Sequence, residues 1–352
     1  MKLWYRYLLF KLAKTFHFIL FCIFIGYILV DLSVNGVRFF SEGSTTFIDT
    51  ILYYLRQFAM HLELFLPLSF LLASMKVLVD FNSHRELVAL QMAGLSKKKL
   101  LSPFFLFAGF LTLVCYVNTQ WFAPEAQEAV YLFRDAHPKA GKKKIKKQKL
   151  FSLSLDDDSE LVYQRFDASK KELFDVFWVR SADDIWHMKY LKTLSKPPIG
   201  RFVDHLTRNF EKQFEKSESF ETRAFPKLLW KEDATLQRFV PFENRSLTQL
   251  LQQASADTAE RASVFSHLHY KIALPLLHFF ILFSIGPISM RFARHRPTFL
   301  IAACSLFGFI SLMIILDGML ILGENQVFPG YFAIWLPMAI TFACVLRPFI
   351  KL

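Results

Sequence analysis

The side chains from which enzymes build metal and acid–base sites are present in this chain, but not at the spacings that catalysis needs. Its 352 residues include 10 His and 4 Cys, and the histidines show no metal-ligand spacing. No H-E-x-x-H, G-x-S-x-G or paired-cysteine motif occurs, and Gly141-Lys142-Lys143 lacks the upstream glycine and the Ser or Thr of a P-loop. The sequence therefore predicts a protein without catalytic residues, a metal site, a cofactor or an ATPase motif of its own.

Positive charge is the second chemical feature of the sequence. The lysine-rich run 142–149 is typical of a solvated loop, and the alternative is a contact for anionic lipid headgroups or phosphates. The formal net charge is +12. In a chain as apolar as this one, such an excess is typical of cytoplasmic loops and headgroup contact, and nucleic acid is not expected as a partner.

Residues 83–99, SHRELVALQMAGLSKKK, combine helix signals with a cluster of lysines. Ser83 and Glu86 have the spacing of a capping box, and Gly94 suits the left-handed turn that ends a helix. Spacing of i, i+3, i+4 and i+7 gives the helix one mostly apolar face, formed by Leu87, Leu90, Gln91 and Gly94. We therefore predict a short helix over 83–94, between two membrane spans on their basic side.

Long apolar runs must position this helix. The chain is 53% hydrophobic with 41 Phe, and its mean hydropathy of +0.30 is too high for a soluble protein. An interfacial helix is expected over 1–14, followed by six spans of about 20 residues. Because no small-x-small cleavage site follows the first run, we expect a span there rather than a signal peptide. The predicted spans are 15–34, 62–79, 100–122, 272–290, 298–320 and 331–346.

The basic residues of the short loops predict the orientation of these spans. They cluster before the first span, around 85–99, at 291–296 and after the last span, whereas the opposite segments 31–61 and 321–330 contain only Arg38 and Arg56. Both termini and the 83–94 helix are therefore expected in the cytoplasm. The long middle, 123–270, is expected outside it, because long domains translocate largely regardless of their charge.

The middle segment is predicted to be mostly β-structure. Short aromatic or β-branched runs alternate with turn-like clusters, which favours a small antiparallel sandwich or open barrel. Residues 200–231 remain open between long strands and helix, and 246–253 is expected to be a short helix. The predicted strands are 149–155, 160–166, 173–180, 185–191 and 238–242.

One stretch resembles a known family. Glu86-Leu87-x-Ala89-Leu90-x-x-Ala93-Gly94-Leu95-Ser96 is similar to the cytoplasmic coupling helix of the LptF/LptG permeases, the membrane subunits of the lipopolysaccharide exporter. The resemblance continues in Asn118-x-x-Trp121-x-x-Pro124, in Ala273-Leu274-Pro275 and in Pro329 with Ala333-x-Trp335-x-Pro337. The order of three spans, a soluble β domain and three spans matches as well.

The resemblance implies an α-helical membrane protein with six transmembrane helices and an all-β, jellyroll-like periplasmic domain inserted between helices three and four. The expected domains are an N-terminal membrane half at 1–122, the β-jellyroll at 123–270 and a C-terminal membrane half at 271–352. It also implies a multi-pass protein of the bacterial inner membrane that pairs with a second LptF/LptG-type permease.

The implied function is that of a permease subunit in an ATP-driven exporter that extracts lipopolysaccharide and passes it to a periplasmic bridge. The implied partners are a dimeric LptB-type cytoplasmic ATPase and periplasmic jellyroll proteins of the LptC and LptA types. Two alternatives stay open. One is a mechanotransmitting ABC membrane subunit that does not conduct substrate, and the other is a lipid-modifying membrane enzyme.

The resemblance also assigns candidate residues. ATPase coupling is expected at Glu86, with Arg85, Leu87, Leu90 and Gly94 around it; the alternative for Glu86 is the capping box, and for Arg85 a solvated cation. Arg38 and Arg56 are candidates for lipid phosphate contact, or else interfacial side chains that snorkel to lipid.

Two acids, Asp31 and Asp317, lie near the outer ends of predicted spans. An acidic group inside a membrane is by default a functional candidate, and the alternative is a helix-end residue in water.

Overall fold

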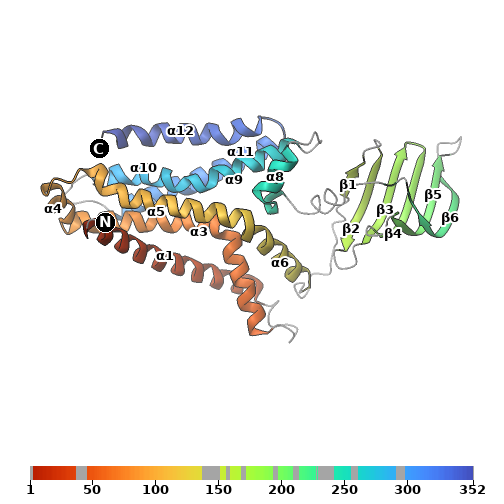
Figure 1. Cartoon of the computed structure of the whole chain (residues 1–352), viewed down its shortest axis with the longest axis horizontal. Coiled ribbons are helices and arrows are strands. Elements are labelled where there is room, and N and C mark those ends of the chain that lie inside the picture. Colours follow the sequence, from red (N-terminus) through yellow and green to blue (C-terminus); the bar gives the residue numbers. More distant parts are fainter. Residues whose placement is uncertain are drawn as a thin grey trace. The chain divides into compact units, whose positions relative to one another are not determined.

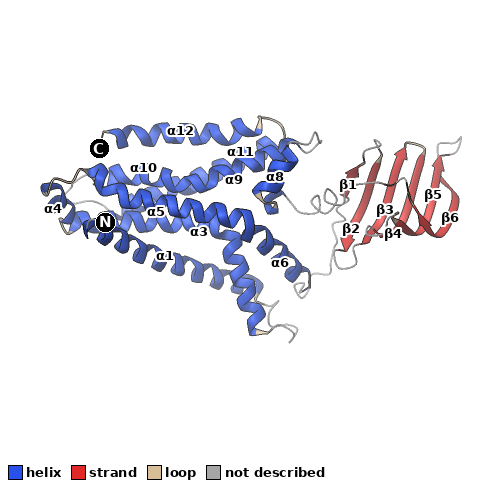
Figure 2. Ribbon diagram, viewed as in Figure 1, coloured by secondary structure: helices blue, strands red, loops and turns tan. Residues whose placement is uncertain are grey.

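The computed structural model describes residues 3–36, 46–136, 151–155, 159–167, 172–192, 197–208, 214–226, 228, 242–254, 261–290 and 298–351. The chain divides into two compact units. One comprises Met1–Gly141 with Phe242–Leu352, and the other comprises Lys142–Pro241. The first unit is built of helices and the second of strands (Figure 2). We call them the helical unit and the β unit.

Within its described residues, the helical unit contains six helices that are long and apolar enough to cross a membrane, as the sequence predicts. The elements of this unit, in chain order, are α1 (Leu3–Asn35), α3 (Phe47–Ser83), α4 (Glu86–Met92), α5 (Lys97–Val117), the π-helix η1 (Asn118–Phe122), α6 (Ala123–Ala136), the 3-10 turn η2 (Phe242–Asn244), α8 (Leu247–Ala254), α9 (Arg261–Ala273), the 3-10 turn η3 (Leu274–Leu276), α10 (Leu277–Met290), α11 (Thr298–Glu324) and α12 (Gly330–Ile350).

Several helices extend beyond their predicted spans. The predicted interfacial helix and first span form the single helix α1. Its N-terminal part packs into the core through Leu8 and Leu12. Helix α3 begins fifteen residues before the predicted span, where Thr46 and Asp49 form a capping box. Span three continues through η1 into α6, so helix extends past the predicted domain boundary at 122.

The fourth span is interrupted at Pro275. This residue has no backbone N–H to donate, and the helix narrows to the 3-10 turn η3 between α9 and α10. The hydroxyl of Thr112 on α5 donates to the Pro275 carbonyl oxygen at 3.0 Å. The interruption is therefore tied to a neighbouring helix, which is how proline is tolerated inside a membrane helix.

The core of the helical unit lies between α3, α5 and α10, with Phe70, Leu101 and Leu282 fully buried in it. Figure 1 shows α1 and α12 on opposite sides of these central helices. At the corner between α11 and α12 the chain passes very close to α9. A Cβ added to Gly330 would lie 2.8 Å from the Ser266 backbone nitrogen, so only glycine fits there.

The described part of the β unit is one six-stranded antiparallel sheet whose strands pair in chain order. Of residues 200–231, which could be strand or helix by sequence, 200–208 and 214–224 are strand. One face of the sheet carries an apolar cluster that includes Leu161, Trp178 and Met188. The strands are β1 (Phe151–Ser154), β2 (Glu160–Asp167), β3 (Glu172–Ser181), β4 (Asp184–Lys192), β5 (Ile199–Arg208) and β6 (Phe214–Ala224).

The remaining sequence predictions for the middle segment have different outcomes. The short helix expected over 246–253 is α8. Of the strand predicted over 238–242, Phe242 lies in η2 instead, and 238–241 lie outside the described residues. The lysine-rich run up to residue 149 also lies outside them. The jellyroll topology stays a prediction, since the described strands form a meander.

Candidate coupling site and the polar contacts of the helical unit

The predicted capping box at the coupling helix is wrong. Helix α3 continues through Ser83, so the Ser83 hydroxyl donates back to the Asp80 carbonyl oxygen at 2.9 Å. The chain then turns through Arg85, which has a left-handed backbone (φ 59°) and makes no side-chain cap, and α4 begins at Glu86. The left-handed turn predicted at Gly94 is present, with φ +85°. The helix is therefore a seven-residue α4 instead of the longer 83–94.

The predicted coupling residues lie on different faces of α4. Leu87 is only 3% exposed and packs in the core of the helical unit, and Leu90 packs against the same core. Arg85 and Gly94 are exposed. Two further exposed residues, Val88 and Met92, were missed by the sequence argument. Their i, i+4 spacing was visible, but an outward apolar pair cannot be told from an inward one before the packing is known.

Glu86 lies against helix α1, a contact that the sequence did not predict. The Tyr7 hydroxyl donates to one Glu86 carboxylate oxygen at 3.4 Å, and the Lys11 ammonium lies 4.0 Å from the other. The same ammonium lies 4.3 Å above the ring of Phe81, near the end of α3. Three helices, α1, α3 and α4, therefore meet around one carboxylate.

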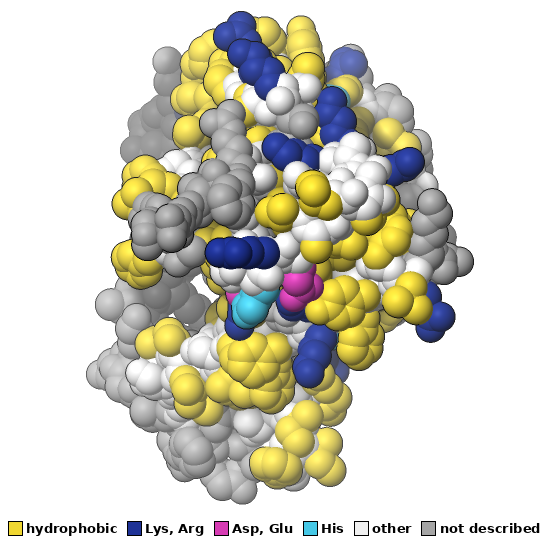
Figure 3. Space-filling view, turned by 90° about the vertical axis from the view of Figure 1, so that its left-hand side faces the viewer, with side chains coloured by type: hydrophobic (Ala, Val, Ile, Leu, Met, Phe, Trp, Pro, Cys, Tyr) yellow, Lys and Arg dark blue, Asp and Glu magenta, His cyan; other side chains and the backbone are white. Residues whose placement is uncertain are grey.

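The lysines after α4 belong to the start of α5. Ser96 caps this helix by accepting from the Lys99 backbone N–H at 3.3 Å, and Lys98 donates to the Ile350 carbonyl oxygen near the end of α12 at 3.2 Å. Helix α4 and both chain ends therefore lie at one end of the helical unit (Figure 1). Figure 3 shows that face, where Lys and Arg side chains are spread around a small acidic and histidine group.

Of the two arginines expected at lipid phosphates, only Arg56 is described. Arg38 lies outside the described residues, and Arg56 is an exposed side chain on α3. Asp31 is buried, not in water, and accepts from Tyr54 at 3.2 Å and from Asn35 at 2.7 Å. The hydroxyl of Tyr270 donates to the other acid near a span end, Asp317.

A buried cation in the helical unit was also missed. Lys271 on α9 is only 6% exposed, and its ammonium donates to the carbonyl oxygens of Glu243 at 2.8 Å and Arg245 at 2.7 Å. It thereby holds the segment that returns from the β unit. The sequence contained no signal for this role. Lys271 stands one residue before the predicted fourth span, where a lysine is indistinguishable from an ordinary flanking cation.

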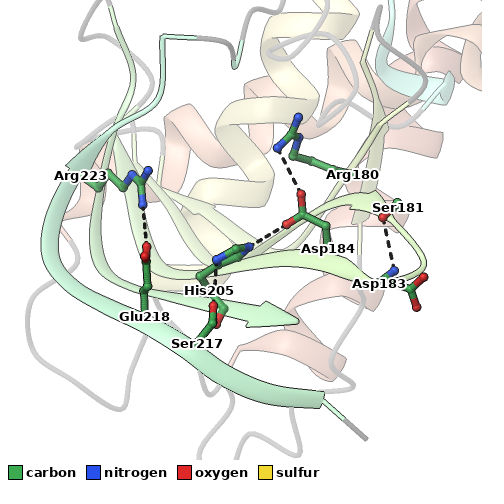
Figure 4. A network of polar contacts seen from close by, with 8 residues as sticks. All are labelled: Arg180, Ser181, Asp183, Asp184, His205, Ser217, Glu218 and Arg223. Atoms are coloured by element: carbon green, nitrogen blue, oxygen red, sulfur yellow. Dashed lines mark hydrogen bonds and ion pairs between the residues drawn. The ribbon is translucent and has the colours of Figure 1, made fainter. Parts of the chain in front are cut away.

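A Ser–His–Asp arrangement occurs in the β unit, where Figure 4 shows it. His205 contacts Asp184 through Nε2 at 2.8 Å and Ser217 through Nδ1 at 2.9 Å, and its ring stacks on Trp186. The Ser217 hydroxyl also donates to the His205 carbonyl oxygen at 3.3 Å. A carboxylate only accepts, so Nε2 donates to Asp184, and in the neutral imidazole the single Ser217 proton is shared between Nδ1 and the His205 carbonyl oxygen. The group joins β4, β5 and β6.

A second polar cluster joins β5 and β6. Asp204 accepts from Lys216 at 2.7 Å and from Ser219 at 2.6 Å. These two hydrogen bonds hold the pKa of Asp204 below its ordinary value. Within the described residues, no group of three or more His, Cys, Asp or Glu side chains is placed to hold a metal ion.

Six apolar helices and an inserted antiparallel sheet define a multi-pass helical membrane protein with a separate β unit. Residues 6–351 match the family described as "Lipopolysaccharide export system permease LptF/LptG". Because the match covers nearly the whole chain, the protein belongs to the LptF/LptG family, whose members are transporter permeases. No individually curated protein matches the chain.

Proposed function

We propose that this protein is the permease subunit of an ATP-driven exporter that extracts lipopolysaccharide from the bacterial inner membrane and passes it to a periplasmic bridge. Family membership supports the substrate class. The coupling mechanism is supported by the packing of α4. One side of this short helix packs on the core, and its other side is exposed. A permease subunit without an ATPase motif needs such a helix to receive the movement of a separate ATPase subunit, its motor.

The motor docks on the outer side of α4. Val88 and Met92 offer an apolar contact, 37% and 86% exposed, and Arg85 adds a charge beside it. Leu87 and Leu90 serve a different purpose, because they fasten the helix to the core. A push by an LptB-type ATPase on α4 therefore reaches α3 and α5, since close-packed side chains transmit displacement.

The end of the helical unit with α4 lies in the cytoplasm, together with both termini. The lysines at the start of α5 support this orientation, because cations are enriched in cytoplasmic loops. The β unit then lies in the periplasm and passes lipopolysaccharide to jellyroll proteins of the LptC and LptA types. The inserted domain, 123–270 by the sequence, includes this β unit.

A second LptF/LptG-type permease covers the open side of the helical unit. The most apolar windows of α1 and α11 are only 6% and 11% buried, and large side chains such as Phe21 and Phe307 are exposed. A heterodimer formed over such helices encloses a cavity between the spans for the lipid. Arg56 and Arg38 are the cations that we assign to its phosphates.

Copurification tests the coupling mechanism. The affinity-tagged chain is coexpressed with candidate partners, either unmutated or as Met92→Asp, with Leu251→Asp as control because Leu251 on α8 is also exposed. We expect the ATPase to copurify with the unmutated chain and the control but to be lost from Met92→Asp, with the permease still folded. If the unmutated chain brings down no ATPase, the exporter function is wrong.

A crosslinking experiment separates this function from a mechanotransmitting subunit that conducts no substrate. A photoreactive amino acid is placed at Phe21 on α1, where the side chain is 62% exposed. Lipopolysaccharide crosslinked there during ATP turnover supports transport through the spans. Its absence from α1, with the ATPase bound and active, supports the mechanotransmitter instead.

A further inference from the structure

Helix α1 packs against the helical unit along one side, and Phe24 in its middle contacts Phe58 of α3. Leu8, Leu12 and Phe16 bury its inner part. Its outer part is held by hydrogen bonds to α3, with Tyr27 donating to Gln57 at 3.0 Å and Tyr54 donating to Asp31. The 33-residue helix is thus free along most of its length on one side.

The inner end of α1 also has polar contacts to α4. Lys11 and Tyr7 lie one turn apart on the same face of α1, and both approach the Glu86 carboxylate. Leu8, between them in the sequence, is buried in the same core as Leu87. The two helices therefore contribute to one core and are also joined by an ionic contact.

The surroundings strengthen this ionic contact. The Lys11 side chain is 28% exposed and that of Glu86 is 35% exposed, so neither is fully solvated. The ring of Phe81 lies under the ammonium and removes water from one side of it. A charge pair is screened less when it is partly removed from water. The pair therefore resists separation of α1 from α4 more than an exposed pair would.

We propose that Lys11 and Tyr7 are positioning residues that transmit the displacement of α4 to helix α1 through the Glu86 carboxylate. The inference rests on the proposed function, because it takes α4 to be the helix that the motor moves. It gives Glu86 a partner within its own chain. When α4 moves, the N-terminal end of α1 follows, and the hydrogen bonds of Tyr27 and Asp31 to helix α3 hold its C-terminal end. The motor thus tilts the helix whose exposed side faces the lipid or the second permease.

Charge exchange tests the proposal. Lys11→Glu, Glu86→Lys and the double variant are each assembled into the full complex, and Lys14→Glu is the control because Lys14 is an exposed cation of the same helix. Three quantities are measured: ATPase bound per permease, ATP hydrolysed, and lipopolysaccharide delivered per ATP. We expect the single variants to keep the ATPase and lose about fivefold or more in lipid delivered per ATP. The double variant recovers most of this loss, and the control behaves as the unmutated chain.

Several outcomes overturn the proposal. One is a Lys11→Glu variant that delivers lipid normally. Another is loss of the bound ATPase in Glu86→Lys that the double variant does not restore, which would make Glu86 a contact to the motor. If the charge variants do not fold, Tyr7→Phe and Lys11→Gln replace them, and normal delivery by both also refutes it. Failure of the unmutated chain to bind any ATPase refutes the proposed function instead.

Discussion

Three spans of the helical unit are packed on most sides, and three are open. The most apolar windows of Phe47–Ser83, Lys97–Gln127 and Arg261–Met290 are 67%, 50% and 61% buried. Those of Leu3–Asn35, Phe299–Glu324 and Gly330–Ile350 are 6%, 11% and 22% buried. We call the first three the central spans and the others the outer spans. Both groups are strongly apolar, so apolarity alone does not decide which spans lie in the centre.

The central and outer spans can be equally apolar because the solvent around them is lipid. In water, an apolar helix face must be covered by protein, but lipid chains are as apolar as leucine. Central and outer spans can therefore have the same composition. Polar groups inside the bundle follow a different rule, as where the amide of Asn118 on one central span donates to the Ala59 carbonyl oxygen on another at 2.9 Å. Such groups must be satisfied by protein, because lipid offers no partner.

The reactivity of the native cysteines tests the division into central and outer spans, and here we expect the largest difference. Cys22, Cys304 and Cys344 are exposed on the outer spans, whereas Cys115 is 1% exposed on a central one. In detergent, an apolar thiol reagent should modify the three exposed cysteines promptly. Cys115 should react at least about a thousandfold more slowly, because the helices must first separate.

Mass spectrometry of the purified chain after timed labelling measures the four rates. Unfolding in strong detergent is the control, since all four thiols should then react alike. Rapid labelling of Cys115 in the folded protein would show that the central spans are not closed. In the assembled complex, slower labelling of Cys22 would identify a partner that covers α1.

Truncation of an aromatic side chain gives the next largest effect. Phe70 on a central span has no exposed surface, and Phe21 on α1 is 62% exposed. Phe70→Ala should lower the free energy of unfolding by about 3–5 kcal/mol, because it opens a cavity in a close-packed core. Phe21→Ala should lower it by less than about 1 kcal/mol, since lipid or detergent fills the space.

Unfolding of both variants in mixed micelles with increasing SDS, followed by circular dichroism, gives the two values. Equal losses would contradict the division into central and outer spans. They would mean that α1 is packed as tightly as α3.

Replacement of a cation compares a satisfied buried group with an exposed one. Lys271→Met leaves the Glu243 and Arg245 carbonyl oxygens without their donor, so we expect a loss of about 2 kcal/mol. Lys76→Met, at an exposed position of α3, should change stability by less than about 0.5 kcal/mol. The same unfolding measurement applies. An unchanged free energy of unfolding in Lys271→Met would show that water replaces the ammonium as the donor to the two carbonyl oxygens.

The fold was predictable where local signals are strong. Six spans follow from run length alone, and β2, β3 and β4 follow from short β-branched and aromatic runs between turns. The ends of the helices were not predictable to the same degree. Ser83 has the spacing of a capping box with Glu86, but the packing of α3 extends that helix to Ser83 and leaves its hydroxyl no such role.

The candidate site was predictable only in part. The short helix was predicted from its own sequence signals, and the structure has it at Glu86–Met92 within the predicted 83–94; its coupling role was predicted from the family resemblance and stays a proposal. The direction of its side chains was not predictable, because Leu87 and Val88 are both apolar and only the packing decides which one is buried. The contact of Glu86 with Tyr7 joins residues 79 positions apart. A single sequence has no signal for a pair so distant.

The smallest effect concerns a link between the two groups of spans. Tyr270 on α9 donates to Asp317 on α11, and Tyr270→Phe removes only this hydrogen bond. Hydrogen bonds between membrane helices contribute about 0.6 kcal/mol on average, so we expect a loss of that size in SDS unfolding. Tyr331→Phe is the control, because that side chain is 58% exposed on α12 and its replacement should change nothing measurable. A loss as large as that of Lys271→Met would show that α11 is held to the centre as firmly as the central spans are held to one another. Burial would then describe how much of a span is covered, but not how strongly it is attached.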